Sequence, residues 1–276
     1  MKKTFITDLD HTFLRTDLSL SSFTKEQWNK KSSNSFLSVA TARTYNKTLQ
    51  FLKGIDINMP MILLDGALIA TMDKKIIDTK FISKDIADSI IAEGAKLGIY
   101  PFVLALGETK KLSELFLHSD ILNKHQAEVL TRYTKEDNLQ EVINIKAMEK
   151  NFKIVYMGER ELLTNLAKEI ENIFGDSLKY ILAPEAYVGC YFLTILHPDA
   201  DKSHGIVTLS EYSGFEMSDL SVFGDNLNDL GMFKLAGISV AVANAHEEVK
   251  SMANVILPFT NDEDGVAKYL EGLQSE

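Results

Sequence analysis

The sequence has few of the residues that mark secreted, membrane-bound or zinc-binding proteins. It contains one cysteine, Cys190, so an internal disulfide is excluded, and we expect Cys190 to be a small core residue of an apolar strand. No cluster of His and Cys has the spacing of a zinc site. The apolar run behind the basic residues 1–3 ends at Asp8, which is too short for a signal peptide, and no stretch approaches a membrane span. We therefore expect a cytoplasmic protein without a membrane partner.

Positive charge is also scarce. The formal net charge is −10 and there is no basic tract, which argues against nucleic acid as a partner. The same charge repels a phosphorylated ligand, so an anion site here needs a local group of cations. A hydrophobic content of 45% and a length of 276 residues instead indicate a globular protein with one large domain or two modest ones.

Two patterns of hydrophobic residues distinguish different parts of the chain. Short, continuously apolar runs that alternate with helical patterns are typical of a parallel sheet covered on both faces. The predicted strands of this kind are 5–9, 36–40, 61–64, 220–223, 238–242 and 255–257. Between them, longer strands joined by short turns, with two long helices, indicate an α+β insertion. We predict a discontinuous α/β domain, 1–81 plus 198–276, that carries an inserted domain, 82–197.

Acidic residues follow two of the predicted parallel strands. Asp8 and Asp10 come directly after an apolar run, and carboxylates at i and i+2 on a continuing strand share a face. Asp225 and Asp229 follow another run, and their spacing places them on one side of a helix entrance. Because the ends of parallel strands meet in one crevice, these groups form a dense negative pocket. Such a pocket favours a cation with hard oxygen ligands, and Mg²⁺ fits best.

These residues suggest phosphoryl transfer. Asp8 is the candidate nucleophile and Asp10 the candidate acid and base, because a carboxylate can attack phosphorus and a second one can carry the proton. Lys202 is expected to neutralise phosphoryl oxygens, and Thr41 to donate a hydroxyl hydrogen bond. Taken singly, each has a simpler interpretation: Thr41 as a helix N-cap and Lys202 as a solvated lysine.

In combination, these segments resemble the motifs of the haloacid dehalogenase (HAD) superfamily, Cof-like branch, over essentially the whole chain. The matching segments are Asp8-Leu9-Asp10-His11-Thr12, Val39-Ala40-Thr41-Ala42-Arg43, Asp201-Lys202-Ser203-His204-Gly205 and residues 224–229. The resemblance implies a Rossmann-like doubly wound parallel sheet with an inserted α+β cap domain of the C2B type, which closes over the site and contributes specificity.

The resemblance also implies roles for individual residues. Mg²⁺ would be held by the Asp8 side chain, the Asp10 main-chain carbonyl and Asp225. Phosphate contacts are implied for Thr41, the Ala42 backbone, Arg43, Lys202 and Asn228. Supporting roles are implied for Thr12, Asp229 and Asn244.

Three positions depart from the family pattern. His11 and Ala42 stand where the family usually has glycine, and neither change removes a group that the chemistry requires. We expect His11 to be a tolerated side chain. Asp65 stands where asparagine is usual, so it adds a carboxylate that either weakens phosphate binding or caps the following turn.

The sequence therefore predicts a Mg²⁺-dependent phosphatase acting on a small phosphorylated metabolite, and the resemblance makes sugar phosphates the leading class. A sugar phosphomutase and a non-catalytic phosphometabolite-binding protein are the alternatives. A monomer or homodimer is expected. Segments near 110–111, 118–125 and 187–190 are candidates to face the site, among which the sequence does not choose.

Overall fold

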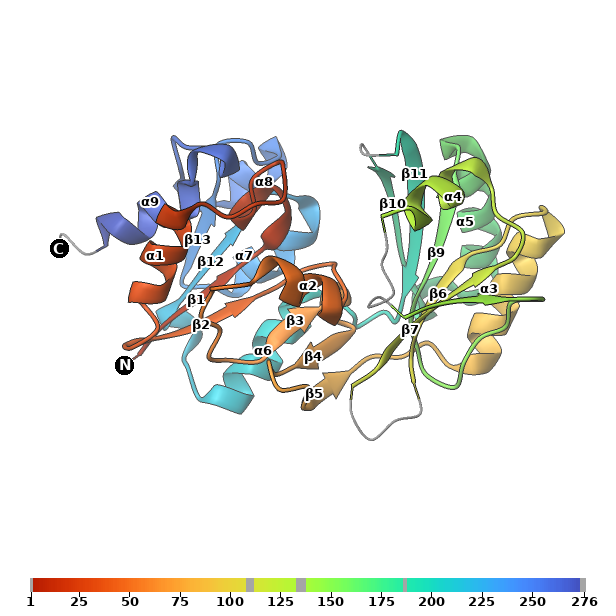
Figure 1. The fold of residues 1–276 in the computed structure, drawn as a ribbon, viewed down its shortest axis with the longest axis horizontal. Coiled ribbons are helices and arrows are strands. Elements are labelled where there is room, and N and C mark those ends of the chain that lie inside the picture. Colours follow the sequence, from red (N-terminus) through yellow and green to blue (C-terminus); the bar gives the residue numbers. More distant parts are fainter. Residues whose placement is uncertain (1, 108–111, 133–137, 186–187, 274–276) are drawn as a thin grey trace. The chain divides into compact units, whose positions relative to one another are not determined.

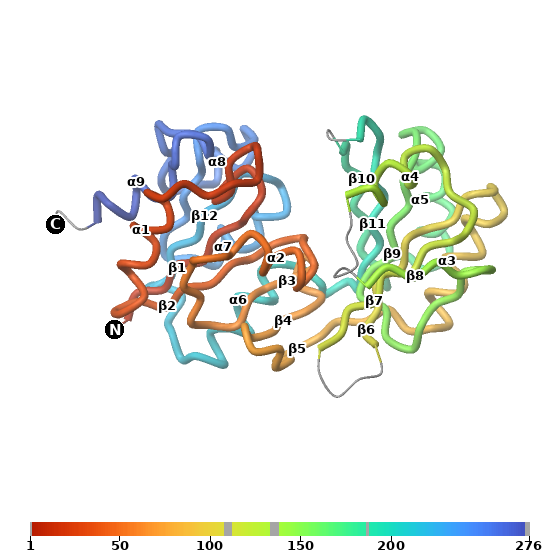
Figure 2. Tube along the Cα trace, in the orientation of Figure 1, coloured from red at the N-terminus to blue at the C-terminus, as the bar shows by residue number. Residues whose placement is uncertain are grey.

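The chain folds into two compact units. A computed structural model describes residues 2–107, 112–132, 138–185 and 188–273. Unit 1 comprises Met1–Asp78 and Asp201–Glu276, and unit 2 comprises Thr79–Ala200. Figure 2 shows this discontinuity, because the red-to-orange and the cyan-to-blue parts of the trace share unit 1. The units divide after residues 78 and 200, whereas the junctions predicted from the sequence follow residues 81 and 197.

Unit 1 is built on a five-stranded parallel sheet in the order β14-β13-β12-β1-β2. Its strands are β1 (Lys3–Thr7), β2 (Ser35–Val39), β12 (Leu220–Gly224), β13 (Ile238–Ala241) and β14 (Val255–Ile256). The central strand β1 is buried from Thr4 to Thr7, in keeping with its continuous apolar run. The parallel sheet predicted from the sequence is confirmed.

The predicted strand 61–64 has a partner that was not expected. β3 (Met61–Leu63) pairs antiparallel with β4 (Leu68–Ala70), and β5 (Ile76–Thr79) completes a separate three-stranded sheet. A parallel bridge between Ala40 and Ile62 links β3 to the end of β2, and the Thr41 N–H donates to the Ile62 carbonyl over 2.9 Å. An apolar run marks a buried strand but does not identify its neighbour, so the sequence predicted the parallel contact of β3 but not its antiparallel ladder with β4.

Among the described residues, unit 1 has six α-helices. They are α1 (Ser22–Lys30), α2 (Tyr45–Phe51), α6 (Lys202–Ser213), α7 (Leu230–Leu235), α8 (Glu247–Met252) and α9 (Gly265–Gly272). α1 packs beside α9, so segments from the two ends of the chain lie side by side (Figure 1). Trp28 of α1 is fully buried and its ring lies 4.8 Å from that of Phe13. This contact fixes α1 against the segment that follows β1.

The two points where the insertion leaves and rejoins unit 1 are joined by a side-chain contact. The imidazole Nε2 of His204, in the first turn of α6, lies 2.7 Å from a carboxylate oxygen of Asp78 in β5. Asp78 is the last residue of the first segment of unit 1, and His204 lies three residues after Asp201, which begins the second. The exit and return of the chain are therefore adjacent within unit 1.

Unit 2 contains a six-stranded sheet in the order β10-β11-β9-β6-β7-β8. The strands are β6 (Phe102–Leu106), β7 (Glu114–Ser119), β8 (Leu139–Val142), β9 (Asn151–Gly158), β10 (Lys179–Glu185) and β11 (Cys190–Leu196). The helices are α3 (Lys84–Lys96), α4 (Lys124–Leu130) and α5 (Arg160–Phe174). All strand pairs are antiparallel except β7 with β8. This mixed sheet with two long helices matches the α+β insertion that the sequence predicts.

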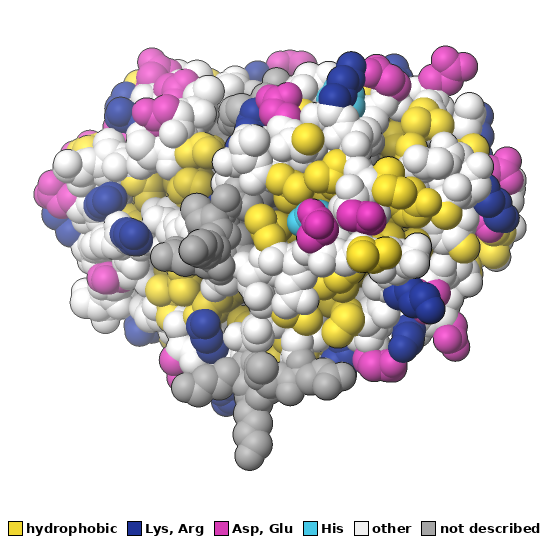
Figure 3. Space-filling view, turned by 45° about the vertical axis from the view of Figure 1, so that its right-hand side comes forward, with side chains coloured by type: hydrophobic (Ala, Val, Ile, Leu, Met, Phe, Trp, Pro, Cys, Tyr) yellow, Lys and Arg dark blue, Asp and Glu magenta, His cyan; other side chains and the backbone are white. Residues whose placement is uncertain are grey.

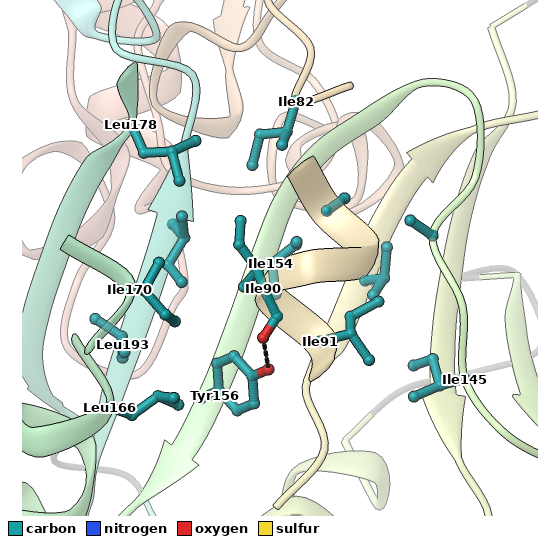
Figure 4. Close-up of a cluster of buried hydrophobic side chains, with 14 of the residues drawn as sticks. Ile82, Ile90, Ile91, Ile145, Ile154, Tyr156, Leu166, Ile170, Leu178 and Leu193 are labelled. Atoms are coloured by element: carbon teal, nitrogen blue, oxygen red, sulfur yellow. Dashed lines mark hydrogen bonds between the residues drawn. The ribbon is translucent and has the colours of Figure 1, made fainter. Parts of the chain in front are cut away.

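The core of unit 2 lies between its sheet and the helices α3 and α5. Ile90 of α3, Ile154 of β9 and Ile170 of α5 are all fully buried there (Figure 4). Tyr156 reaches into the same layer, and its hydroxyl donates a 2.8 Å hydrogen bond to the Ile90 carbonyl. Burial raises the pKa of Tyr156, so the phenol acts as a neutral donor.

Charged side chains are dispersed over the surface shown in Figure 3. Lys and Arg lie singly or in small groups among apolar and acidic side chains on the described part of that face, rather than in one broad basic patch. None of the helices in the described segments is long and apolar enough to cross a membrane.

Candidate active site

The register of the parallel sheet brings the predicted site residues together. Thr7, the last residue of β1, is paired with Val39 on one side and with Phe223 on the other. The residues that follow these strand ends therefore start at one level, at the carboxyl edge of the sheet. This edge is where open parallel sheets bind ligands.

Four buried charged groups meet at this edge. The ammonium of Lys202 donates to Asp8 over 2.5 Å and to Asp229 over 2.6 Å. Carboxylate oxygens of Asp8, Asp225 and Asp229 all lie within 4.8 Å of one another, and all three residues are buried. Lys202 is only 1% exposed, which rules out its interpretation as a solvated lysine.

Burial dominates the electrostatics of this cluster. It raises the pKa of Asp8 well above its usual value, and the charges of Asp229 and Asp225 add to this effect, whereas Lys202 opposes it. Burial and the Asp229 charge also raise the pKa of Asp225 to about 6. For Lys202, burial lowers the pKa, but Asp229 and Asp8 outweigh it and raise the pKa. Three carboxylates with one cation leave excess negative charge, which a divalent cation with oxygen ligands would neutralise.

Asp229 organises the loop after β12. Its Oδ2 accepts hydrogen bonds from the backbone N–H groups of Asp225 and Asn226, at 2.9 and 3.0 Å, while its Oδ1 accepts from Lys202. A Cβ on Gly224 would lie 2.5 Å from Oδ2, so only glycine leaves room for this carboxylate. Asp229 thus contacts both Lys202 and the backbone of the loop that carries Asp225.

The turn after β1 is held by two of the expected supporting residues. The Thr12 hydroxyl donates a 2.7 Å hydrogen bond to the Asp225 carboxylate. The side-chain amide of Asn244 donates to the His11 carbonyl over 2.8 Å. His11 has a φ of 55°, a left-handed conformation that explains why glycine is usual in the family, and it adopts this conformation with an imidazole.

Asp10 lies outside the buried cluster. Arg43 donates two hydrogen bonds to its carboxylate, from Nε over 2.7 Å and from a terminal nitrogen over 2.5 Å. The Arg43 guanidinium also lies over the Phe51 ring, 4.5 Å from its centroid. The i, i+2 spacing of Asp8 and Asp10 therefore separates the two carboxylates instead of pairing them. The family resemblance implies a phosphate contact for Arg43, but nothing in the sequence indicates its contact with Asp10.

Thr41 and Ala42 lie at the end of β2. Thr41 is fully buried and its hydroxyl oxygen accepts from the Arg43 N–H over 3.1 Å. The N-cap of α2 is Thr44, whose side chain accepts from Lys47, so the N-cap interpretation of Thr41 is wrong. Ala42 is exposed beside it.

A second carboxylate–amide contact lies at the same edge. Asn228 donates from its side-chain Nδ2 to Asp65 Oδ1 over 3.1 Å. Asp65 is 6% exposed and follows β3 in a turn with left-handed backbone. Asp65 is recognisable in the sequence as an unusual carboxylate, but its hydrogen bond with Asn228 is not.

The remaining candidates belong to unit 2. His118, His125 and Cys190 are buried, and Cys190 begins β11 as a core residue. Lys110, Lys111 and Tyr187 lie outside the described residues.

Comparisons with known proteins identify the family. Residues 5–270 match the family model of haloacid dehalogenase-like hydrolases. Two Bacillus subtilis (strain 168) proteins, YitU and YwtE, are named 5-amino-6-(5-phospho-D-ribitylamino)uracil phosphatases. YitU is 25% identical over 96% of this chain and 94% of its own length, and YwtE is 23% identical over 97% and 96%.

Solved structures share the fold. TM0651 from Thermotoga maritima superposes with a TM-score of 0.80 at 24% identity, over 99% of this chain and 97% of its own. The HAD subclass IIB sugar phosphatase BT4131 superposes with a TM-score of 0.75 at 19% identity, over 99% of both chains. The solved structures thus share the fold, and the family match over residues 5–270 shows that the chain belongs to the haloacid dehalogenase-like hydrolases.

Proposed function

We propose that the protein hydrolyses a small phosphorylated metabolite in a Mg²⁺-dependent reaction, through a phosphorylated Asp8. The observation that carries the proposal is the buried group of Asp8, Asp225 and Asp229 beside Lys202. A buried carboxylate that accepts a hydrogen bond from a lysine, with two further carboxylates near it, fits a carboxylate nucleophile that acts next to a metal ion.

The carboxylate cluster fits Mg²⁺ by its chemistry. Its donors are hard oxygens, and their burial raises the pKa of Asp8 and Asp225, as expected for sites that lack sufficient positive charge. The proposed ligands are the side chains of Asp8 and Asp225 with the Asp10 main-chain carbonyl. When bound, Mg²⁺ would supply positive charge that offsets the repulsion between the carboxylate nucleophile and the phosphoryl oxygens. Asp229 is committed to Lys202 and to two backbone N–H groups, so its proposed role is support.

The protein residues carry the chemical steps. Lys202 occupies Oδ1 of Asp8, which leaves Oδ2 to attack phosphorus as the bond to the ester oxygen breaks. Asp10 donates its proton to that oxygen, so a neutral alcohol leaves. Asp10 then takes a proton from the water that attacks the phosphoryl group on Asp8, and orthophosphate is released. Thr41, the Ala42 backbone, Arg43, Lys202 and Asn228 are the proposed phosphoryl contacts.

The substrate class rests on the relatives. The name of YitU describes a phosphate on a ribityl chain, and BT4131 is named as a sugar phosphatase. We infer that a sugar or sugar-alcohol phosphate is the leading class for this chain, with unit 2 as the cap domain that contributes specificity. We further propose that the protein is a cytoplasmic monomer or homodimer and that it acts without nucleic acid or a membrane.

The proposal is tested by phosphate release over a panel of sugar phosphates, with Mg²⁺ or with EDTA, for the wild type and Asp8→Asn. We expect Mg²⁺-dependent release from the wild type and a loss of at least about 10³-fold in Asp8→Asn, because the nucleophile is removed. Mg²⁺ should also raise the thermal unfolding midpoint of the wild type more than that of Asp225→Asn.

Wild-type rates in Asp8→Asn would exclude this carboxylate as the nucleophile. Isomer interconversion without phosphate release would indicate a mutase instead. Asp73→Asn, on an exposed turn of unit 1, changes the net charge equally and serves as the control.

A further inference from the structure

The turn that carries Asp65 has an unusual backbone. Leu64, Asp65 and Gly66 have φ angles of 52°, 56° and 92°, so three consecutive residues are left-handed. This conformation disfavours side chains with a Cβ, and a leucine more than an aspartate, and it persists only where the surroundings fix it. A turn of this kind is a candidate for a functional role, which the contacts around it specify.

Hydrogen bonds attach this turn to the end of β2. The Leu64 N–H donates to the Arg43 carbonyl over 3.1 Å, and the Asp65 N–H donates to the Thr41 carbonyl over 3.0 Å. On its other side, a Cβ on Gly66 would lie 2.1 Å from the carbonyl oxygen of Asp201. The turn is therefore fixed between the segment of Thr41 and the start of the helix that carries Lys202.

The Asp65 side chain has one hydrogen-bonding partner among the described residues, the amide of Asn228 at 3.1 Å. It is 6% exposed, and within the described parts of the chain no lysine or arginine forms an ion pair with it. Burying a carboxylate without a cation is unfavourable, so the hydrogen bond from Asn228 is the compensation that the described residues give to this side chain.

A carboxylate has a specific effect on a neighbouring amide. It only accepts hydrogen bonds, so the Nδ2 group of Asn228 must face Asp65 and the amide oxygen must face away. The second N–H of Nδ2 then keeps a fixed direction and stays available to an anion. Asn228 itself is exposed, and without this partner its amide would be free to turn.

We propose that Asp65 is a positioning residue, which holds the Asn228 amide in the orientation that binds the phosphoryl group. The inference rests on the proposed function, since it takes Asn228 as a phosphoryl contact. The turn between Thr41 and Lys202 places the carboxylate before substrate arrives, so less conformational entropy of Asn228 is lost on binding.

Asp65 can be replaced without disturbing the turn. Glycine adopts a positive φ readily, so Asp65→Gly keeps the backbone and deletes the acceptor. Asparagine also tolerates this conformation, and in Asp65→Asn the amide oxygen can accept from Asn228. The two variants therefore form a matched pair that differs in the hydrogen-bond acceptor, and thermal unfolding of both checks that the fold is retained.

The experiment measures kcat, KM and the inhibition constant of orthophosphate for five proteins. These are the wild type, Asp65→Gly, Asp65→Asn, Asn228→Ala and the double variant Asp65→Gly/Asn228→Ala. We expect Asp65→Gly and Asn228→Ala each to raise KM and the inhibition constant about tenfold, with kcat changed by less than about threefold. Asp65→Asn should retain most of the phosphate affinity, and the double variant should bind no more weakly than Asn228→Ala.

Two results overturn the inference: wild-type phosphate affinity in Asp65→Gly, or losses that multiply in the double variant. If the wild type hydrolyses no phosphate ester, the proposed function fails, but calorimetric binding of orthophosphate to the same five proteins still decides the role of Asp65. A wild type that binds no orthophosphate overturns both.

Discussion

Arg43 holds both carboxylate oxygens of Asp10 through two nitrogens of one guanidinium. A bidentate pair of this kind fixes the direction of the carboxylate as well as its distance. Because the guanidinium also lies over the ring of Phe51, the last residue of α2, the position of Asp10 depends on α2 as well as on β1. Asp10, the proposed proton donor and acceptor, follows β1, but its side chain is held by Arg43, which lies just before α2.

Replacing Arg43 should therefore impair turnover. We expect Arg43→Lys and Arg43→Ala to lower kcat by about tenfold or more, since a lysine cannot form the two parallel bonds and a misplaced catalytic group is costly. Steady-state kinetics with the best substrate of the panel measure this. Arg15→Ala is the matched control, because Arg15 makes a similar bidentate pair with Asp264 away from the strand-end cluster. Equal losses in both variants would contradict a specific role for Arg43.

Gly224 should not tolerate even an alanine. The added Cβ would lie 2.5 Å from the Asp229 carboxylate, which would have to move away from Lys202 and from the backbone of the loop. We expect Gly224→Ala to reduce kcat/KM by at least about tenfold and to lower the unfolding free energy by about 1–3 kcal/mol, the usual cost of overpacking. Gly272→Ala, at the end of α9, meets no atom within 4 Å and should be close to neutral. Activity assays and denaturant unfolding compare the two variants.

Asp264 should make the stability of unit 1 depend on pH. Burial alone raises the pKa of this carboxyl, but hydrogen bonds from Arg15, Ser21 and Thr24 outweigh it and lower the pKa below its usual value. A lowered pKa in the folded state stabilises the protein above the unfolded pKa of about 3.9, and this contribution is lost as the pH falls through the folded pKa.

Asp264→Asn is the suitable variant, because asparagine accepts the left-handed φ of 60° at this position. Since the Arg15 side chain is 36% exposed, solvent screens the pair, and we expect the variant to be less stable by about 1 kcal/mol at pH 7. The difference should shrink below about pH 4. Thermal unfolding of both proteins from pH 7 to pH 3 measures it, and a difference that stays constant over this range would refute the assignment.

The fold was predictable where burial leaves a pattern in the sequence. β1, β2 and β12 read as continuous apolar runs because both faces of the sheet are covered. β8 was not predicted, because Leu139–Val142 is short and partly exposed and its sequence has neither an apolar run nor a clear alternation of apolar and polar residues. β3 was recognised as a strand but its antiparallel ladder with β4 was not predicted, since pairing depends on the path of the chain.

The site was predictable where the backbone alone brings residues together. Asp8, Asp225 and Asp229 follow strands that are neighbours in a parallel sheet, so their meeting needs only the topology. The contacts of Asp10 with Arg43, and of Asp65 with Asn228, depend on side-chain directions and on a left-handed turn. No spacing in the sequence encodes those features.

The contact between Asp78 and His204 has a consequence for how this architecture can change. Because the chain leaves and re-enters unit 1 at neighbouring points, the whole of unit 2 is topologically one long surface loop. The closure entropy of such a loop grows only slowly with its length. Lengthening, shortening or exchange of the insertion therefore places little demand on the parallel sheet. The residues at the strand ends can therefore keep the same chemistry while the sequence and length of the insertion change.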